Sequence, residues 1–599
     1  MRGSFLSKIR KMKTYALDFE TVYTKTLSIK TLGPRGYFSH PEFDAYLMTV
    51  VGEDGYVFAG HPKDFDWQML AGQQIVAHNA SFDESLYLYG VTQNWWDNVE
   101  YAEWQCTADL TSYCKLPRAL KGAAKEVLGV EADKSTRDNM INLRWENMSE
   151  EFRKEVTEYA IKDSELCLQL WQKLSHKWPE HERKLSQHTR MICRRGIPID
   201  TDMLQKNLQI LKVKLFDAEQ AIPWAYELTP LSRKGFNAQC RKQNVEPPAS
   251  MAKNSPEASE WLAAHQVDCP WAVAVSEYRR INALLKKLES FEAATMEDGR
   301  YYGGLLYFGA HSGRWSGSGG NLNLQNLPRD EMFGVNLRKM IATKDTHRLI
   351  VADLSQIEVR TLSWLADDKE MLDRISKTAD IYEAFAVMFG LFDPEKAGGS
   401  LKKKDPELRH VVKAMALAAG YGVGPAKLTL MYGLTPEKAD WAVQLYRSHM
   451  PSVLKLWRAY DRGMNGAHAA GVPFTLELPS GRVMDYGMLT KIKSKFGFAF
   501  KAQIRKQGRV ADIFPYAGFL AENASQALAR DVFSDMLLRI EEAGYKIIFH
   551  VHDEVIVEVP AEEAEAAQHE IDKIMATPPD WISDIPLASE SHIYRVYEK

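Results

Sequence analysis

Residues 348–365 read RLIVADLSQIEVRTLSWL, and this stretch decides the fold of the C-terminal half of the chain. The apolar run before Asp353 predicts a buried β-strand that ends at this carboxylate, and a helix is expected to begin directly after it. Ser355 and Glu358 also have the spacing of a capping box, in which Glu358 would only start the helix. Taken alone, the motif favours that second interpretation.

A second carboxylate motif changes this balance. Residues 546–551 and 555–559 are β-rich runs that flank His552, Asp553 and Glu554, so they predict a hairpin with carboxylates at its tip. A carboxylate in a tight turn is often only a turn former. Two adjacent charges at a buried strand end, however, are seldom tolerated unless they are paired or hold a metal. Asp353 and Asp553 are therefore candidates for a two-metal site.

Between these motifs, residues 409–422 read RHVVKAMALAAGYG. Arg409, Lys413, Leu417 and Tyr421 are spaced by four and would lie along one helical stripe. Two cations, an apolar residue and an aromatic ring could contact a triphosphate, a sugar and a base in succession. The alternative is an amphipathic surface helix with basic residues.

Carboxylates also cluster near the N-terminus. Residues 14–20 predict a strand that places Asp18 and Glu20 on one face, and Asp83 ends the sequence Asn-Ala-Ser-Phe-Asp. The set is completed by Tyr159 and Asp163, one turn apart on an expected helix.

Four carboxylates that converge on one place repel each other unless cations lie between them. Two Mg²⁺ ions about 3.5–4 Å apart could activate a water and hold the leaving oxygen of a phosphodiester. As alternatives, Asp83 could cap the following helix, and Tyr159 with Asp163 could be an ordinary surface pair.

The composition is that of a globular chain with several domains. There are 599 residues with a formal net charge of −4, and 45% of them are hydrophobic. The sequence contains neither a long apolar run for a membrane helix nor an apolar signal segment, and its six cysteines form no CxxC pair. We therefore expect a cytoplasmic protein without a disulfide framework or zinc site. Residues 185–295 and 366–465 are expected to be helical, with loops over 230–256 and a helix start at Ser255-Pro256.

The C-terminal motifs DLSQIEVR, RHVVKAMALAAGYG and HVHDE resemble those of family A DNA polymerases, the DNA polymerase I family. The resemblance runs from about residue 191 to the C-terminus. Further matching pieces lie at 312–314, 323–328, 478–482 and 522–527.

The ordered N-terminal set resembles proofreading 3′–5′ exonucleases of the DEDDy type over about residues 12–178. This resemblance implies that Tyr159 orients the attacking water. It also implies that the metals are held by Asp18, Glu20, Asp83 and Asp163.

Together, the two resemblances imply a multidomain α/β fold: an RNase H-like exonuclease domain followed by a right-hand polymerase. The implied ranges are 1–180 for the exonuclease, 181–300 for a mainly helical thumb, 301–365 and 466–599 for the palm, and 366–465 for the fingers.

The resemblance also implies roles in synthesis. Asp353 and Asp553 would bind two Mg²⁺, which Mn²⁺ could replace, with Glu554 nearby. Glu358 would exclude a ribose 2′-OH, and Tyr421 would pack at the templating base. The implied contacts with the dNTP are Arg409, Lys413, Leu417, Tyr421, Glu358, Gln356 and Tyr382, and those with DNA are Arg314, Asn326, Gln526 and His552.

The implied partners are primer–template DNA and dNTPs, with processivity or replisome factors as further candidates and no membrane. The exonuclease motifs begin almost at residue 14, which leaves no room for a 5′ nuclease domain. Compact phage and plasmid replicative enzymes share that layout, so phage genome replication is the expected role.

Two positions depart from the family pattern. Leu417 stands where the family carries Phe or Tyr beside the incoming sugar, which predicts strong discrimination against dideoxynucleotides. Leu354 replaces a common Tyr, and the sequence offers no explanation for this change.

Residues 490–510 contain seven cations and no acid. Lys491, Lys493 and Lys495 are expected to contact DNA, because basic residues that alternate with Phe496, Phe498 and Phe500 suit a loop that grips a nucleic-acid backbone. A solvated basic loop with three strand-spaced core phenylalanines is the alternative.

Three other functions compete with a proofreading DNA polymerase. The first is an exonuclease whose C-terminal part only binds nucleic acid, but the presence of both Asp353 and Asp553 favours synthesis. The second is a single-subunit RNA polymerase, against which Glu358 and the attached exonuclease motifs argue. The third is a non-catalytic clamp, which is the weakest because all the expected metal carboxylates are retained.

Overall fold

The computed structural model describes residues 12–598 except 102, 132–134, 252–254, 319–323, 379, 495–496 and 507–508. The N-terminal part is built on a five-stranded sheet of order β3-β2-β1-β4-β5. These strands are β1 (Thr14–Glu20), β2 (Leu47–Gly52), β3 (Val57–Gly60), β4 (Gln74–Ala77) and β5 (Glu103–Cys106). The predicted strand over 14–20 is confirmed, and it pairs antiparallel with β2 and parallel with β4.

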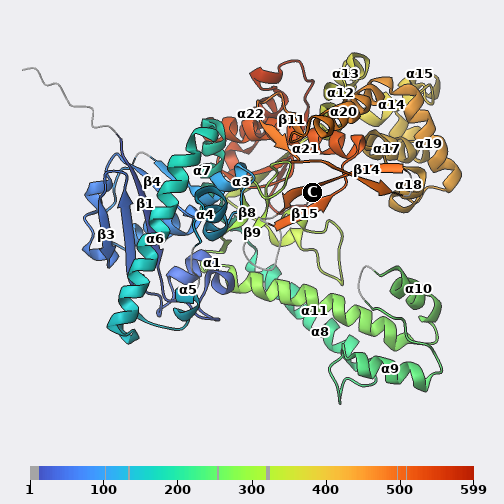
Figure 1. The fold of residues 1–599 in the computed structure, drawn as a ribbon. Coiled ribbons are helices and arrows are strands. Elements are labelled where there is room, and N and C mark those ends of the chain that lie inside the picture. Colours follow the sequence, from blue (N-terminus) through green and yellow to red (C-terminus); the bar gives the residue numbers. More distant parts are fainter. Residues whose placement is uncertain are drawn as a thin grey trace, which may run out of the picture.

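The long helix α6 (Glu150–Leu174) packs against β1 and β2 of this sheet (Figure 1). Because α6 crosses the sheet, Tyr159 and Asp163 come close to the end of β1. The other helices of this unit are α1 (Ile29–Phe38), α2 (Ala80–Thr92), α3 (Thr107–Tyr113), α4 (Leu120–Leu128) and α5 (Ser135–Asn139).

A helical extension follows. Helices α8 (Thr201–Gln220) and α11 (Pro270–Ala294) lie side by side, and α9 (Arg233–Lys242) and α10 (Pro256–His265) sit at their far end (Figure 1). The predicted start of α10 is confirmed, because Ser255 caps it. The prediction of loops over 230–256 is wrong in part, since Ser232 accepts a hydrogen bond from the Gly235 N–H and starts α9.

The C-terminal part contains a four-stranded sheet of order β16-β17-β10-β18. Its strands are β10 (His347–Leu354), β16 (Ile547–Val551), β17 (Glu554–Pro560) and β18 (Ser589–Tyr594). The predicted hairpin is confirmed, and β17 pairs antiparallel with both β16 and β10. Helices α21 (Ala517–Glu542) and α22 (Ala564–Ala576) pack on this sheet.

The predicted helical segment 366–465 is also confirmed. It follows α12 (Ile357–Leu365), and further along the chain α21 leads back to β16 of the four-stranded sheet. Its elements are α13 (Lys369–Ser376), α14 (Ile381–Met388), α15 (Pro394–Ala397), α16 (Leu401–Lys404), α17 (Pro406–Ala418), α18 (Pro425–Tyr432), α19 (Pro436–His449) and α20 (Pro451–Ala470).

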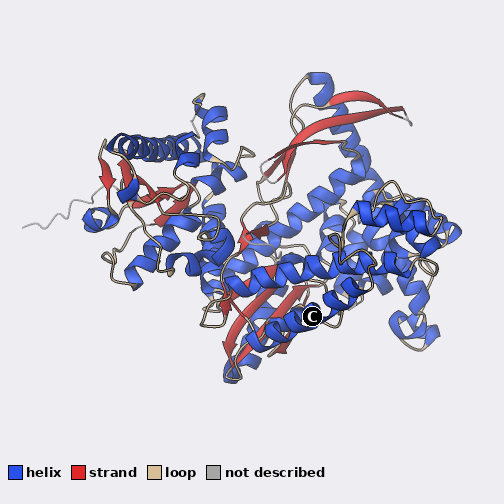
Figure 2. Ribbon diagram, turned by 90° about the horizontal axis from the view of Figure 1, so that it is seen from below, coloured by secondary structure: helices blue, strands red, loops and turns tan. Residues whose placement is uncertain are grey.

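Short strands complete the fold. They are β6 (Ile197–Pro198), β7 (Arg300–Tyr301), β8 (Gly304–Leu306), β9 (Ser316–Ser318), β11 (Thr475–Glu477) and β12 (Val483–Asp485). Residues 490–510 were expected as a basic loop, but the described residues there belong to a three-stranded antiparallel sheet of β13 (Thr490–Ser494), β14 (Gly497–Lys506) and β15 (Arg509–Ile513), which projects from the body (Figure 2).

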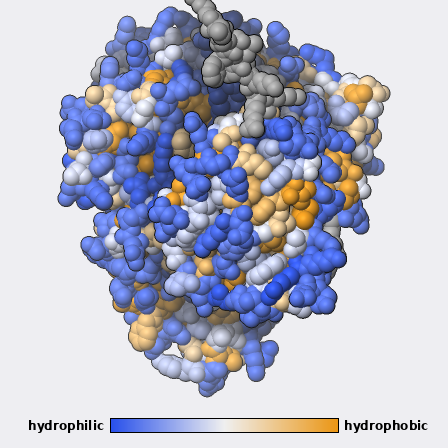
Figure 3. Space-filling view, turned by 90° about the vertical axis from the view of Figure 1, so that its left-hand side faces the viewer, coloured by the Kyte–Doolittle hydropathy of each residue, from blue (hydrophilic) through white to orange (hydrophobic). Residues whose placement is uncertain are grey.

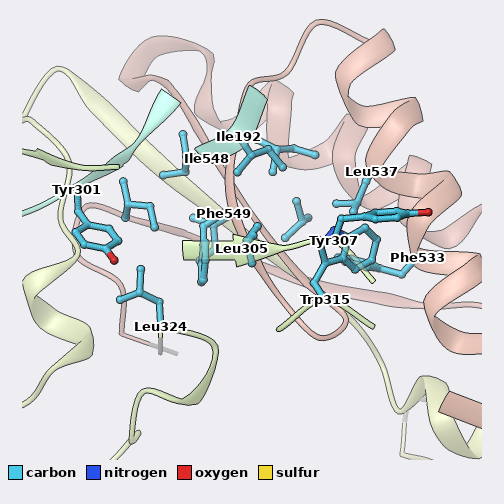
Figure 4. Close-up of a cluster of buried hydrophobic side chains, with 14 of the residues drawn as sticks. Ile192, Tyr301, Leu305, Tyr307, Trp315, Leu324, Phe533, Leu537, Ile548 and Phe549 are labelled. Carbon is cyan, nitrogen blue, oxygen red and sulfur yellow. The ribbon is translucent and has the colours of Figure 1, made fainter. Parts of the chain in front are cut away.

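Helix α7 (Glu180–Arg195) joins the two halves. Ile192 on this helix lies in a buried cluster with Leu305 of β8, Leu537 of α21 and Ile548 of β16 (Figure 4). Hydrophobic burial of this kind stabilises by about 25 cal/mol per Å² of apolar surface. The two halves therefore share one core across α7.

Buried ion pairs flank this core. Glu182 of α7 accepts a hydrogen bond from Arg530 of α21 at 2.9 Å and another from Tyr307 at 2.6 Å. Burial alone would raise the pKa of Glu182, but the Arg530 guanidinium outweighs it and lowers the pKa to about 2. Replacing one member would leave the other charge buried without its partner.

We expect Glu182→Gln to lower the free energy of unfolding by about 3 kcal/mol, because Arg530 would then lack its main countercharge. Urea unfolding measures this change. Glu180→Gln is the matched control, since Glu180 is 81% exposed in its pair with Lys184, and exposed pairs contribute about 0–1 kcal/mol. Equal losses in the two variants would contradict the prediction.

The surface and the cysteines add little that is specific. The side formed by the N-terminal unit is mainly hydrophilic, with separate apolar areas (Figure 3). Among the described residues, no helix is both long and apolar enough to cross a bilayer. The six cysteines are free thiols.

Two candidate active sites

The N-terminal acidic residues line one cavity of about 830 Å³. The cavity brings together all five residues that the sequence singled out: Asp18, Glu20, Asp83, Tyr159 and Asp163. Strand alternation explains the first two, because Phe19 between them is 4% exposed and stacks on Trp96 inside the core. Tyr159 and Asp163 therefore do not form an isolated surface pair.

Asp83 lies at the bottom of this acidic cavity and is 2% exposed. It does not cap α2, whose N-cap is Asn79 in a left-handed conformation (φ 78°). Instead, a carboxylate oxygen of Asp83 accepts the backbone N–H of Phe19 at 3.2 Å. Burial, reinforced by the charge of Glu20, raises the pKa of Asp83 to about 8.

The second site forms where β10 ends beside the β16–β17 turn. Asp353 lies on β10 and Asp553 lies in the adjoining turn, and the Leu354 N–H donates to the Asp553 carbonyl at 3.1 Å. Burial and the negative charge of Asp353 raise the pKa of Asp553 to about 7. The sequence prediction that these two carboxylates share one site is consistent with this geometry. Leu354 itself is 1% exposed and belongs to the core.

Glu554 faces Asp353 across the β10–β17 pair and is 7% exposed. It accepts a hydrogen bond from the Tyr597 hydroxyl at 2.6 Å. Tyr597 was not predicted, because no motif surrounds it near the C-terminus. Its hydrogen bond helps to hold Glu554 beside Asp353 and Asp553.

The capping-box interpretation of Glu358 is wrong. Helix α12 begins after Gln356, which has φ 43° and makes no side-chain cap. Glu358 instead pairs with Arg314 at 2.6 Å, which holds both side chains near Asp553. The Oε1 atom of Gln356 is buried and has no hydrogen-bond partner among the described residues.

Helix α17 carries the cationic stripe. Arg409 donates to Asp380 at 2.8 Å, and its guanidinium lies 4.9 Å from the ring centre of Tyr382. Lys413 is exposed and Leu417 is half-buried. The first three residues of the predicted stripe therefore lie on one helix, with Tyr382 adjacent.

Tyr421 departs from that prediction. Helix α17 ends at Ala418, and Tyr421 lies in the following 3₁₀ turn, Ala419–Tyr421. Its ring is buried, and its hydroxyl lies 3.3 Å from both the Ser525 hydroxyl and the Glu358 carbonyl. Tyr421 is thus next to Glu358, although it is not on the helical stripe.

Both sites have the chemistry that divalent cations require. Carboxylate oxygens are the preferred ligands of Mg²⁺, and a bound cation would favour the charged form of Asp83 and Asp553, whose pKa values are raised mainly by burial and further by a neighbouring carboxylate. In the described part of the chain, no three His, Cys, Asp or Glu side chains already form a group that could hold a metal ion.

Residues 237–599 match the sequence profile of DNA polymerase family A. The chain belongs to this family. As a family A DNA polymerase, it extends DNA under the direction of a template.

Proteins similar to this family A polymerase are also DNA polymerases. The DNA polymerase of Bacillus phage SP02 is 26% identical over 98% of this chain and all of the relative. The thermostable DNA polymerases I of Thermus filiformis and Thermus aquaticus are each 25% identical, over 74% and 71% of this chain. The polymerase spans about half the length of these Thermus relatives, 51% and 49%.

A solved structure has the same fold. It is the POL domain of Pol1 from M. smegmatis in complex with DNA primer-template and dNTP. The TM-score is 0.69 at 18% identity, and the match covers 98% of this polymerase and 96% of that chain.

The predicted DNA contacts of the polymerase lie in different environments. Asn326 is exposed, and Gln526 of α21 donates to Glu522 at 3.4 Å. His552 is exposed in the hairpin turn with φ 55°. Lys491 and Lys493 are exposed on β13, and Lys495 lies outside the described residues.

Two further residues belong near the polymerase site. Burial and the charge of Glu358 raise the pKa of Glu522, while Lys427 and Arg314 oppose this shift. Glu522 was quoted only as part of a motif, and Lys427 had no motif at all. Lys427 lies on α18 and Glu522 on α21, so their proximity depends on how these two helices pack and could not be predicted from local sequence.

Proposed function

We propose that this polymerase extends a primer at the Asp353–Asp553 site and removes mispaired 3′ nucleotides at the Asp18–Asp163 cavity. The observation that carries the proposal is the presence of two separate acidic sites. In each, a nearby carboxylate helps to raise the pKa of a buried carboxyl group. Such sites suit two Mg²⁺ ions each, which Mn²⁺ could replace.

In this proposal the parts of the chain have the roles of a right hand. Residues 1–180 are the exonuclease and 181–300 the thumb. Residues 301–365 and 466–599 are the palm, and 366–465 are the fingers. The four-stranded sheet would then be the floor of the synthetic site, with α17 above it.

At the synthetic site, bound Mg²⁺ would lower the pKa of the primer 3′-OH and stabilise charge on the α-phosphate. Arg409 and Lys413 bind the triphosphate, for which Arg409 exchanges Asp380 for phosphate oxygens. Glu358, held by Arg314, occupies the space of a ribose 2′-OH. Gln356 and Tyr382 line the nucleotide site, and Tyr421 supports the templating base.

At the trimming site, Tyr159 holds and orients the attacking water. Asp18, Glu20, Asp83 and Asp163 hold the cations. Asp83 is 2% exposed and is therefore shielded from bulk water. Electrostatic interactions are stronger in such a buried setting than in water.

The biological role we infer is phage genome replication. The match to a phage DNA polymerase over 98% of this chain and all of the relative supports it. Primer–template DNA and dNTPs are the inferred ligands, and processivity or replisome factors are candidate partners.

Primer extension tests the proposal. The protein is incubated with a 5′-labelled primer–template and Mg²⁺, with and without dNTPs. We expect extension when dNTPs are present and 3′ shortening when they are left out. Extension without shortening would remove the proofreading half, and neither activity would refute the whole proposal.

Metal binding should depend on pH. In the metal-free protein, Asp83 and Asp553 have pKa values of about 8 and about 7, well above the 3.8 of an unperturbed Asp. The folded state therefore binds more protons than the unfolded state, so stability falls as the pH rises from about 4 through 7 to 8.

Mg²⁺ binds the deprotonated carboxylates and should reverse this loss. We expect Mg²⁺ to raise the melting temperature more at pH about 8 than at pH about 6. Calorimetry with and without Mg²⁺ measures this effect, and a variant with both Asp83→Asn and Asp553→Asn serves as the control. An equal shift at both pH values would contradict the assignment.

Leu417 gives a prediction on sugar selection. We expect dideoxynucleotides to be used much less efficiently than dNTPs, by about tenfold to hundredfold, because no aromatic ring lies beside the sugar. Single-nucleotide incorporation kinetics measure the ratio. Leu417→Tyr should reduce this discrimination, and Leu417→Met is the size-matched control. Equal use of both nucleotides by the parent protein would refute the prediction.

A further inference from the structure

The sheet β13–β14–β15 projects from the body of the molecule (Figure 2). It lies between β12 and α21, so the chain passes through it just before the helix that carries Gln526. One face of the sheet is fixed to the core. Phe500, Ala502 and Ile504 of β14 are 8%, 3% and 7% exposed, and they belong to a cluster that includes Leu520 of α21.

The same face continues beyond the core and ends in an exposed aromatic ring. Phe498 is two residues before Phe500 on β14, so both side chains point to the same side of the sheet. Phe498 is nevertheless 79% exposed. An aromatic ring in this position adds nothing to the core.

Two lysines stand opposite these rings. Lys493 is the cross-strand partner of Phe498, and Lys491 is the partner of Phe500. The Lys491 ammonium lies 5.5 Å from the ring centre of Phe500. Lys493 is exposed beside Phe498, which gives this end of the sheet an aromatic face flanked by positive charge.

The opposite face of the sheet differs. There Lys501 pairs with Asp512 at 2.7 Å, and Arg505 pairs with Glu126 of α4 in the N-terminal unit. Two of its cations therefore have carboxylate partners. The Arg505–Glu126 contact also connects the sheet to the N-terminal unit. The sheet that carries Phe498 is therefore held at its core-facing side and by this ion pair.

We propose that Phe498, Lys491 and Lys493 form a contact site for single-stranded DNA, namely the unpaired template strand ahead of the primer end. This proposal rests on the proposed synthetic function. The face of an aromatic ring can stack on a base that is not already stacked in a duplex, and ammonium groups neutralise the adjoining phosphates. A duplex would present phosphates only and would leave the ring of Phe498 without a partner.

The chemistry of the segment favours a polyanion over a protein partner. Residues 490–510 contain seven Lys or Arg residues and no Asp or Glu. A cluster of one charge sign beside an exposed ring matches the stacking platforms of proteins that bind single strands.

The test compares two primer–templates with the same duplex but different unpaired template overhangs, about 2 and about 20 nucleotides, which fall below and above the size of a stacking site. Fluorescence anisotropy gives the affinity for each. We expect Phe498→Ala to weaken binding of the long overhang about fivefold or more, which corresponds to the loss of one stacked base. Binding of the short overhang should not change.

Matched variants separate stacking from other effects. Phe498→Trp should retain the affinity, whereas Phe498→Leu should behave like Phe498→Ala. Val57→Ala removes a 51% exposed apolar side chain from the N-terminal unit and should change neither affinity. The double variant Lys491→Gln/Lys493→Gln should reduce the salt dependence of binding to the long overhang.

Three outcomes would overturn the proposal: an equal loss for both overhangs, no loss for either, or full affinity in Phe498→Leu. Primer extension on the short overhang is measured in parallel for every variant. If the parent protein fails in that assay, the proposed function fails; if only the overhang dependence is missing, the contact site alone is refuted.

Discussion

Asp353→Asn should abolish DNA synthesis and leave 3′ trimming intact. Asp353 ends β10 beside Asp553, and its negative charge helps to raise the pKa of that neighbour. An amide at position 353 would remove one of the two carboxylates that we propose hold the cations. We expect the rate of nucleotide addition to fall by at least about 10³-fold, or about 4 kcal/mol of transition-state stabilisation.

Rapid-quench primer extension measures this effect, and release of labelled nucleotide from the same primer measures trimming. Asp345→Asn is the matched control, because Asp345 lies just before β10 and its side chain is 94% exposed. Synthesis within tenfold of the parent would show that Asp353 is not needed for catalysis.

Asp18→Asn should have the reverse effect. Asp18 lies on the open face of β1 and lines the cavity with Glu20, Asp83 and Asp163. Loss of one carboxylate should lower the rate of 3′ trimming by about 10³-fold, while synthesis with correct dNTPs stays close to that of the parent. Mispaired primer ends should then persist.

Trimming of a mispaired primer end, followed without dNTPs, gives the rate. Glu100→Gln is the control, since Glu100 is an exposed acid of the same unit. If synthesis and trimming disappear together in either the Asp18 or the Asp353 variant, two independent sites are not supported.

Much of the framework could be predicted from local sequence. The strand at 14–20, the hairpin around Asp553 and the helical segment 366–465 are dominated by hydrophobic periodicity, which is a local property. The candidate carboxylates were found for the same reason, because each lies at the end of such an element. The five residues of the N-terminal cavity meet in space as their order along the chain implied.

The failures have a different cause. Glu358 matched a capping box, but the local spacing could not reveal that Arg314 binds it from 44 residues away. Tyr597 and Lys427 carry no motif, so their positions depend on how distant helices and strands pack.

The segment at 490–510 was wrongly predicted as a loop because its seven cations were given more weight than the strand spacing of its phenylalanines. In β14, Phe500, Ala502 and Ile504 face the core while Lys501 and Arg505 face outward. That pattern is amphipathic, although its composition resembles a solvated loop.

Helix α7 has a consequence for how this enzyme could be taken apart. On one side, its Arg190 and Arg194 bind Glu84, the residue next to Asp83, at 2.6 and 3.0 Å. On the other side, Glu182 and Arg195 bind α21. A cut at residue 180 would strand Glu84 as a buried anion in one fragment and Arg190 as a buried cation in the other, whereas Glu182 and Arg530 would stay together. Recombination between relatives would therefore have to exchange α7 together with its partners on both sides.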